Sequence, residues 1–230
     1  MAFCQPHRDT VRSHPKADRG RAGGDQTAGA AVVTDVWSRL ASAHGAAACV
    51  AVGLTPSQIA ALTADQARVI FPLVRRHMIG HERRAVDFGC GAGRFSGHLA
   101  DGTGCSVVAY DPCVEFLAEA PDHPYVVYAA DDRAYLLAQP FDIVFVAMVL
   151  GSPEGSQETT MARLADLLAP GGLLVLLDHM PDEPPGGRWW RFRPFLEYFQ
   201  LSSRHGIALQ KVGEVDQAGN RVAICVGRRK

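Results

Sequence analysis

The sequence predicts an α/β fold with a doubly wound, seven-stranded sheet that is mostly parallel and ends in an antiparallel hairpin. Apolar runs without polar alternation recur between helical segments from residue 85 onward. Such runs are typical of parallel strands that helices cover on both faces. Only a short turn separates the last two apolar runs, Ala208–Val215 and Arg221–Val226. That spacing favours a hairpin over a crossover connection.

Three segments with different compositions divide the chain. Residues 1–30 are rich in Arg, Gly, Asp, His and Pro and lack apolar periodicity, so they are expected to form a disordered extension. Residues 31–80 have helical periodicity and predict a helical cap on the fold. Residues 85–230 carry the alternating strands and helices and predict the α/β core.

Three signals in the sequence predict where the second helical region of the cap begins and where it is interrupted. Thr55, followed by Pro56 and then Gln58, is a pattern typical of a helix start. Pro72 lies inside the following apolar pattern and predicts a kink or a break, because proline lacks the N–H that a helix interior uses. A second capping pattern begins at Thr63.

The core elements follow in a regular order. Before the hairpin, the expected strands are Ala85–Phe88, Ser106–Tyr110, Tyr125–Tyr128, Phe141–Val146 and Leu173–Leu177. Helical segments are expected at Arg94–Leu99, Val114–Glu119, Arg133–Ala138 and Ser156–Leu168. A further helix carries Phe195 and Phe199, whose i, i+4 spacing predicts that both face the core.

Composition limits the classes of function. The chain has 230 residues, of which 47% are hydrophobic, so it can bury the core of one domain. A net charge of −1 does not favour binding to nucleic acids or membranes. No apolar run approaches the ~18–20 residues of a membrane span, and the N-terminus lacks the apolar segment of a secretory signal. The six cysteines form no C-x-x-C pair, which predicts reduced thiols, no metal site and a cytoplasmic protein.

The most informative motif follows the first expected strand. Asp87 and Phe88 lead into glycines at every second position, namely Gly89, Gly91 and Gly93. A strand, a tight glycine turn and a helix start bring the backbone close to a nucleotide. A nicotinamide site of the form G-x-G-x-x-G does not fit this spacing, and an acid beside the turn would repel a pyrophosphate. The same acid would attract a cationic amine.

Val86–Gly93 resembles the D-x-G-x-G-x-G motif of the class I S-adenosylmethionine-dependent methyltransferases. Further landmarks follow in the order of that family, including Asp111 after the second strand and the Pro-Gly-Gly turn within Leu168–Gly172. The resemblance implies a Rossmann-like fold with S-adenosylmethionine as cofactor. The cofactor contacts that it implies are Trp37, Arg39, Asp87, Phe88, Gly89, Cys90, Gly91, Gly93, Asp111, Pro112, Asp131, Asp132, Ala147 and Met148.

The resemblance also implies individual roles. Asp111 would bind the ribose hydroxyls, although it could instead cap the next helix, since Pro112 follows it. Asp131 or Asp132 would contact the adenine amine, with Asp132 favoured. Arg39 would meet the cofactor carboxylate or lie on a solvated helix face.

The expected acceptor site is defined by fewer residues. His179 follows Asp178 at the end of the fifth strand, where ligands of parallel sheets bind, and it is the candidate general base. Alternatively, His179 is a loop residue that only orients its neighbours. The candidate pocket residues are His44, which stands where the family has Tyr, together with Trp189, Trp190 and Tyr198.

The resemblance implies methyl transfer by in-line displacement to oxygen or nitrogen of a small organic acceptor. Two alternatives stay open, namely a non-methylating enzyme with the same cofactor site and a catalytically silent S-adenosylmethionine-binding subunit. The expected partner is the small acceptor, not nucleic acid or membrane. The sequence does not distinguish a monomer from a homodimer.

Overall fold

A seven-stranded sheet in the order β3-β2-β1-β4-β5-β7-β6 forms the centre of the computed structural model, which describes residues 27–131, 140–151, 157–182 and 191–230. The strands are β1 (Arg84–Phe88), β2 (Ser106–Tyr110), β3 (Val126–Ala129), β4 (Phe141–Ala147), β5 (Leu168–Asp178), β6 (Gln210–Gln217) and β7 (Asn220–Arg228). The first five are parallel, while β7 runs antiparallel to both β5 and β6. The predicted doubly wound sheet with its hairpin is confirmed.

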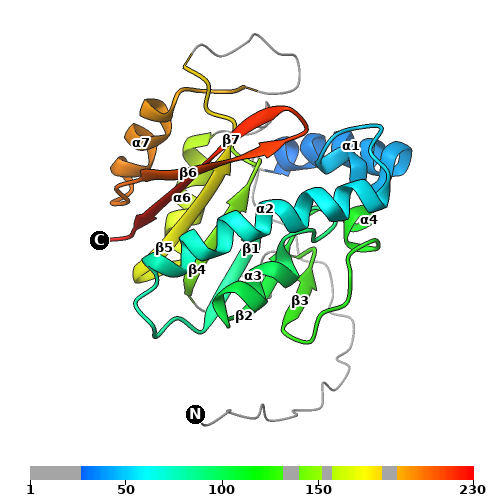
Figure 1. Ribbon diagram of the computed structural model, residues 1–230. Helices are drawn as coiled ribbons and strands as arrows, with labels where there is room; N and C mark the ends of the chain where they lie inside the picture. Colours follow the sequence, from blue (N-terminus) through cyan, green and yellow to red (C-terminus); the bar gives the residue numbers. More distant parts are fainter. Residues whose placement is uncertain (1–26, 132–139, 152–156, 183–190) are drawn as a thin grey trace, which may run out of the picture.

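Helices cover both faces of this sheet (Figure 1). One face carries α2 (Pro56–His77) and α3 (Ser96–Thr103), and the other carries α6 (Gln157–Leu167) and α7 (Phe195–Arg204). The strand order reverses between β1 and β4, so their carboxyl ends form the switch point at which such sheets bind ligands.

Two hydrophobic clusters fill the layers, because successive strand side chains point to opposite faces. Val86 and Val144 pack with α6 and α7, whereas Ala85 and Ile143 pack with α2 and α3. A third, smaller cluster joins α1 (Thr27–His44) and the short helix η1 (Gly45–Cys49) to α4 (Val114–Leu117). This cluster anchors the N-terminal cap beside the carboxyl ends of β1 and β2.

Helix α2 is continuous, so neither the break that Pro72 allowed nor the second cap expected at Thr63 is found. Thr55 caps it with a complete capping box and Pro56 is its first residue, as predicted. However, the helix runs through Pro72 to His77 without a break. Thr63, expected as a second cap, lies buried inside the helix. Packing of the apolar face of α2 on α3 and the sheet outweighs the local effect of the proline.

Strand β5 begins earlier than predicted. The Pro-Gly-Gly segment forms an irregularity within the strand, because Phe141 pairs with Leu168 and Ile143 pairs with Leu173. Gly171 has φ +74°, a backbone conformation that glycine adopts without a steric penalty. The glycine therefore turns the chain locally without ending its pairing with β4.

Two expected segments differ in extent or lie outside the description. Helix α1 starts at Thr27, so residues 27–30 belong to the cap and not to the extension. Residues 1–26 and the helix expected at Arg133–Ala138 lie outside the described residues.

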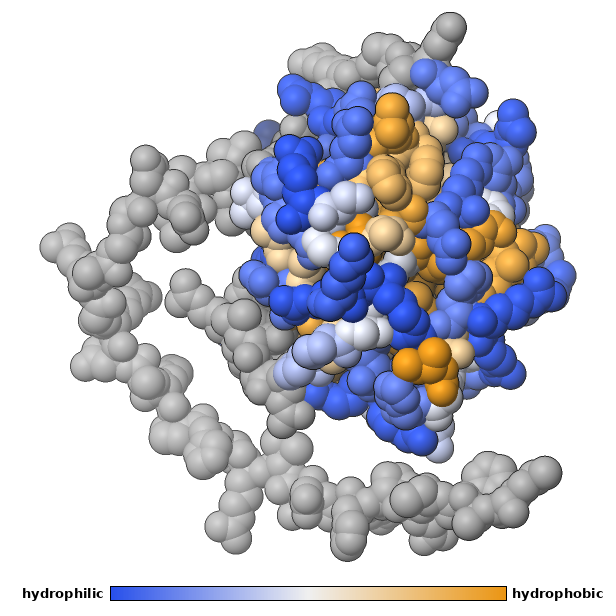
Figure 2. All heavy atoms as spheres, turned by 90° about the vertical axis from the view of Figure 1, so that its left-hand side faces the viewer, coloured by the Kyte–Doolittle hydropathy of each residue, from blue (hydrophilic) through white to orange (hydrophobic). Residues whose placement is uncertain are grey.

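Helix α7 packs on the core with Tyr198 and Leu201, and not with the predicted pair Phe195 and Phe199. Tyr198 and Leu201 are buried, whereas Phe199 is 37% exposed and Phe195 only partly buried. The face shown in Figure 2 is largely hydrophilic with a few separate hydrophobic patches. Among the described helices, none is long and apolar enough to cross a membrane.

Candidate active site

A cavity of about 710 Å³ lies at the carboxyl ends of β1, β2 and β4, below the N-terminal cap. Its size is within the range of roughly 300–1,000 Å³ that is usual for small-molecule sites. Ten of the predicted cofactor residues line it, namely Trp37, Asp87, Phe88, Gly89, Cys90, Gly91, Asp111, Pro112, Ala147 and Met148. The cavity therefore lies where the sequence predicted a nucleotide site.

The three motif glycines all have positive φ, between +55° and +72°. A Cβ on Gly89 would lie 2.5 Å from the side chain of Val149, and one on Gly91 would lie 2.7 Å from Cys49 Sγ. On Gly93 it would lie 2.7 Å from the ring of Tyr128, and Gly93 does not line the cavity. The glycines thus permit the turn and the close approach of neighbouring segments, beyond the room for a ligand that the sequence suggested.

Asp87 is the penultimate residue of β1, and its side chain lines the cavity. It is 3% exposed and accepts a hydrogen bond of 2.7 Å from the Ser96 hydroxyl. Burial raises its pKa to about 7, a rise that Ser96 opposes and the negative charge of Asp111 assists. A cationic group in the cavity would stabilise the ionised carboxylate.

Asp111 connects the glycine loop to the segment after β2. One carboxylate oxygen accepts from Gly91 N at 2.8 Å and the other accepts from Cys113 N at 2.9 Å. Asp111 does not cap α4, since the N-cap of that helix is Cys113 and no side chain caps it. Each oxygen of Asp111 keeps a second lone pair for a ligand hydroxyl. Burial raises the pKa of Asp111.

The N-terminal cap contributes Trp37, Cys49 and Val50 to the cavity wall. Arg39 is exposed on α1 and does not line the cavity. His44, at the end of α1, is also outside the lining. The predicted contacts of Arg39 with the cofactor carboxylate and of His44 with the acceptor find no support in this placement.

The end of β4 forms the side of the cavity next to β5. Met148 has φ +58°, an uncommon conformation for a residue with a side chain, and its N–H donates to Leu177 O at 2.8 Å. Such backbone outliers cluster at ligand sites. Asp131, the expected adenine contact after β3, is exposed, and Asp132 lies outside the described residues.

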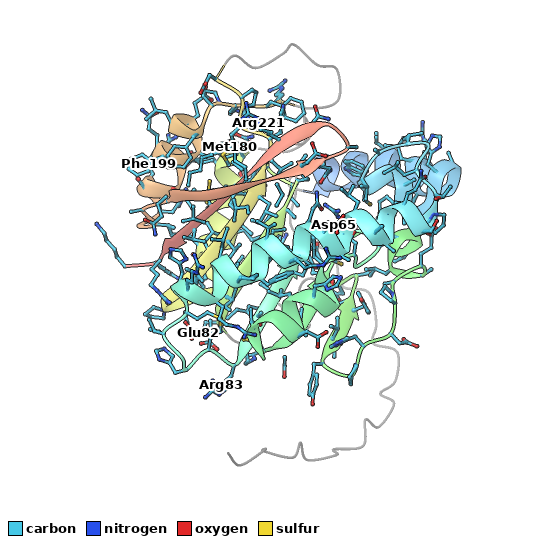
Figure 3. All side chains as sticks on the ribbon, in the orientation of Figure 1. Asp65, Glu82, Arg83, Met180, Phe199 and Arg221 are labelled. Carbon is cyan, nitrogen blue, oxygen red and sulfur yellow. The ribbon has the colours of Figure 1, made fainter. Side chains whose placement is uncertain are left out.

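His179 lies at the carboxyl end of β5, as predicted, but does not line the cavity. Its Nδ1 is 2.6 Å from Arg221 O, and its ring packs edge-on against Phe192 with centroids 4.5 Å apart. Figure 3 shows the neighbouring Met180 and Arg221 at one end of the sheet, with Glu82 and Arg83 at the opposite end. His179 is therefore on the ligand-binding side of the sheet, beside β7.

Asp178 is fully buried and has a different role from its neighbour. It accepts hydrogen bonds from Gly151 N and His179 N, both at 2.8 Å, and from the Tyr198 hydroxyl at 3.1 Å. Tyr198, expected in the acceptor pocket, is therefore a core residue, because its hydroxyl satisfies this carboxylate. Trp189 and Trp190, the other pocket candidates, lie outside the described residues.

Several cavity residues were not predicted. Ile59, Ala60 and Thr63 of α2 line it, as do Arg94 and His98 beside the glycine loop. Arg94 had a signal in the sequence, since a charged residue directly follows the last motif glycine. The α2 residues had none, because only the tertiary fold brings that helix to the loop. Among the described residues, no group of three or more His, Cys, Asp or Glu side chains could hold a metal ion.

Comparison with known proteins agrees with this geometry. A family model described as "Methyltransferase domain" matches residues 60–210. No curated protein matches the sequence significantly.

Three solved structures illustrate the structural likeness. The Burkholderia thailandensis 1,6-didemethyltoxoflavin-N1-methyltransferase, with bound 1,6-didemethyltoxoflavin and S-adenosylhomocysteine, has TM-score 0.66 and 18% identity over 93% of each chain. The magnesium protoporphyrin IX methyltransferase of Synechocystis, with bound S-adenosylmethionine, has TM-score 0.61 and 18% identity over 92% of this chain and 100% of that chain. The Bradyrhizobium japonicum N-methyltransferase NodS has TM-score 0.53 and 20% identity over 72% and 86%, respectively. At these identities the likeness concerns the fold.

Proposed function

This chain belongs to the methyltransferase domain family and is an S-adenosylmethionine-dependent methyltransferase, and on that premise we propose that it methylates an oxygen or nitrogen atom of a small organic acceptor. The observation that supports the proposal best is the cavity of about 710 Å³ that brings Asp87, the glycine loop and Asp111 to one wall. No other feature of the described residues brings together so many of the residues that were predicted to bind the cofactor.

The residues of the cavity fit the chemistry of the cofactor. The carboxylate of Asp111 can accept hydrogen bonds from ribose hydroxyls, and that of Asp87 can bind the α-ammonium group. Apolar side chains, including Trp37 and Phe116, line much of the remaining wall. When bound, S-adenosylmethionine supplies a methyl group on a positively charged sulfur. The protein's contribution is then to hold the acceptor atom in line, which is worth roughly 7–11 kcal/mol.

His179 is the proposed general base for an acceptor that must lose a proton. A carbonyl oxygen has no proton to give, so Nδ1 must donate to Arg221 O across their 2.6 Å separation. The neutral ring then carries its free lone pair on Nε2, as a base requires. Asp178 does not contact the ring, so these two residues do not form a relay.

A small acceptor agrees with the charge and the comparisons. A net charge of −1 provides no electrostatic attraction for nucleic acid. The toxoflavin-precursor and magnesium protoporphyrin methyltransferases, which resemble this chain in fold, are named for small-molecule substrates. We propose the same class of acceptor for this chain.

Product analysis tests the function directly. The purified chain is incubated with methyl-labelled S-adenosylmethionine and a panel of small hydroxyl and amine acceptors. We expect S-adenosylhomocysteine and a labelled product to form in equal amounts. Cofactor consumption without a methylated product would favour the non-methylating alternative. Cofactor binding without turnover of any acceptor would favour the silent subunit.

Calorimetry tests the cofactor site. Asp111→Asn keeps one oxygen for the backbone donors but removes the charge that the ribose hydroxyls would meet. We expect it to weaken S-adenosylhomocysteine binding by about 10- to 100-fold, the usual effect of losing a charged hydrogen bond. A thermal melt in the absence of ligand controls for folding. Unchanged affinity would remove Asp111 from the ribose site.

Kinetics test His179 once an acceptor is found. His179→Ala should lower kcat about 10²- to 10⁴-fold for a hydroxyl acceptor. Turnover equal to that of the wild type would exclude His179 as the base.

A further inference from the structure

Arg94 lies at the wall of the cofactor cavity, directly after the last motif glycine. Its Nη1 donates to Gln66 Oε1 at 2.8 Å and to Thr63 Oγ1 at 3.5 Å. Its Nη2 donates to Gln217 Oε1 at 2.8 Å. All three acceptors are neutral, so none of them balances the positive charge of the guanidinium.

The side-chain amides that hold Arg94 are themselves oriented by the backbone. Gln66 Nε2 donates to Asp216 O at 2.5 Å, and Gln217 Nε2 donates to Val50 O at 3.4 Å. Because both NH₂ groups face backbone carbonyls, both amide oxygens face the guanidinium. Figure 1 shows the elements that supply these contacts, with α2 crossing the sheet and the β6–β7 turn pointing toward the cap. The guanidinium also stacks on the ring of Phe95 at 4.0 Å.

This arrangement leaves a partly buried positive charge that forms no ion pair with another described residue. Within the described part of the chain, no carboxylate forms an ion pair with Arg94. Burial lowers its pKa to about 10, so the group stays protonated at neutral pH. Removing an unpaired charge from water is costly, and neutral polar partners offset only part of that cost. An anion bound in the cavity would offset the rest.

Two donors of Arg94 are available for such an anion. A guanidinium has five N–H groups, and the hydrogen bonds above use two on Nη1 and one on Nη2. One N–H on Nε and one on Nη2 therefore have no protein partner among the described residues. Planar pairs of N–H donors are the usual partners of carboxylates.

Asp87 gives the cavity a negative group in the same region. The side chains of Asp87 and Arg94 both line the cavity, and the hydrogen bond of Asp87 goes to Ser96 and not to Arg94. A free amino-acid end carries one ammonium and one carboxylate, and Asp87 and Arg94 together offer it a carboxylate and a guanidinium.

We propose that Arg94 binds the α-carboxylate of the methionyl part of S-adenosylmethionine while Asp87 binds its α-ammonium. This inference rests on the proposed function of the cavity. It replaces Arg39, which is exposed on α1, as the carboxylate partner. The donor site thereby selects a zwitterionic amino-acid end.

Two methyl-donor compounds that differ by a single carboxylate test the proposal. Calorimetry compares S-adenosylmethionine with decarboxylated S-adenosylmethionine, which keeps the amine, on the wild type and on Arg94→Met. We expect the variant to bind S-adenosylmethionine about 10- to 100-fold more weakly and the decarboxylated form within about twofold of the wild type. Equal losses for both donors, or no loss, would overturn the proposal.

Three comparisons complete the design. Arg94→Lys keeps the charge and should fold if Arg94→Met does not, and it should still lose several-fold affinity for S-adenosylmethionine alone. Arg68→Met, which changes a largely exposed arginine of α2, should bind both donors as the wild type does. A carboxylate-selective loss in Arg39→Met instead of Arg94→Met would overturn the proposal while leaving the methyltransferase function intact. If the wild type bound neither donor, the proposed function would fail as well.

Discussion

Asp87 and Asp178 occupy similar positions but have different surroundings. Each lies at the carboxyl end of a central strand, and their exposed fractions are 3% and 0%. Asp87 accepts one hydrogen bond and lines the cavity, whereas Asp178 accepts three and does not. Burial raises the pKa of Asp87 to about 7 and that of Asp178 to about 6, where three donors oppose the rise.

This difference separates a ligand-binding carboxylate from a structural one. Asp178 joins the loop after β4, the end of β5 and helix α7, and these protein donors occupy three of its roughly four acceptor sites. Asp87 has unused acceptor capacity that faces the cavity. The number of satisfied hydrogen bonds, and not the burial, distinguishes the two roles.

The largest expected effect comes from the same substitution at both positions. Asp178→Ala leaves two backbone N–H groups and the Tyr198 hydroxyl without their acceptor. At about 1–3 kcal/mol for each group, we expect a loss of roughly 3–9 kcal/mol in the free energy of unfolding. Asp87→Ala should lose little or gain stability, because only the Ser96 hydroxyl is affected. Urea denaturation at pH 8 measures both, and similar losses would invalidate the distinction.

The second effect concerns the pH dependence of stability. The pKa of Asp87 rises from 3.8 to about 7 in the folded chain, so its stabilising contribution is complete below pH 3.8 and is lost as pH rises through 7. Asp87→Asn cannot ionise and should be more stable than the wild type above pH 7, by up to about 4 kcal/mol for a difference of roughly three pKa units. This advantage should disappear near pH 4. Thermal melts across this range measure it, and a pH-independent difference would contradict the raised pKa.

The smallest effect comes from removing one hydroxyl donor from each carboxylate. Tyr198→Phe leaves Asp178 with two backbone donors, and we expect a loss of only about 1 kcal/mol in unfolding free energy. Ser96→Ala removes the hydrogen bond that lowers the pKa of Asp87, so the pH at which stability is lost should move upward. Parallel pH titrations of stability compare the two. A larger upward movement for Tyr198→Phe would reverse the assignment of roles.

The fold was predictable because its signals are local. Buried parallel strands leave continuous apolar runs, and the hairpin leaves two runs with a short turn between them. The capping box at Thr55 is also a local pattern. The effect of Pro72 was not predictable, because packing of α2 against α3 and the sheet decides whether the helix continues.

The donor half of the site was predictable for a related reason. Asp87, the glycines and Asp111 lie within two adjacent strand–turn units, so their spacing in sequence determines their position in space. The acceptor half brings together segments that are distant in sequence. Tyr198 was wrongly expected there, since nothing near it in sequence indicates that its hydroxyl meets the buried Asp178.

The sequence alone determined the doubly wound sheet and the methyl-donor motif, because strand periodicity and a glycine turn are encoded by neighbouring residues. Only the tertiary structure decided which charged groups face the cavity. Arg94 faces it because α2 and the β6–β7 hairpin supply the amides that hold its guanidinium, while Arg39 remains on the exposed side of α1. A charge is placed by partners that are remote in sequence, since burying it requires compensation from every element packed around it.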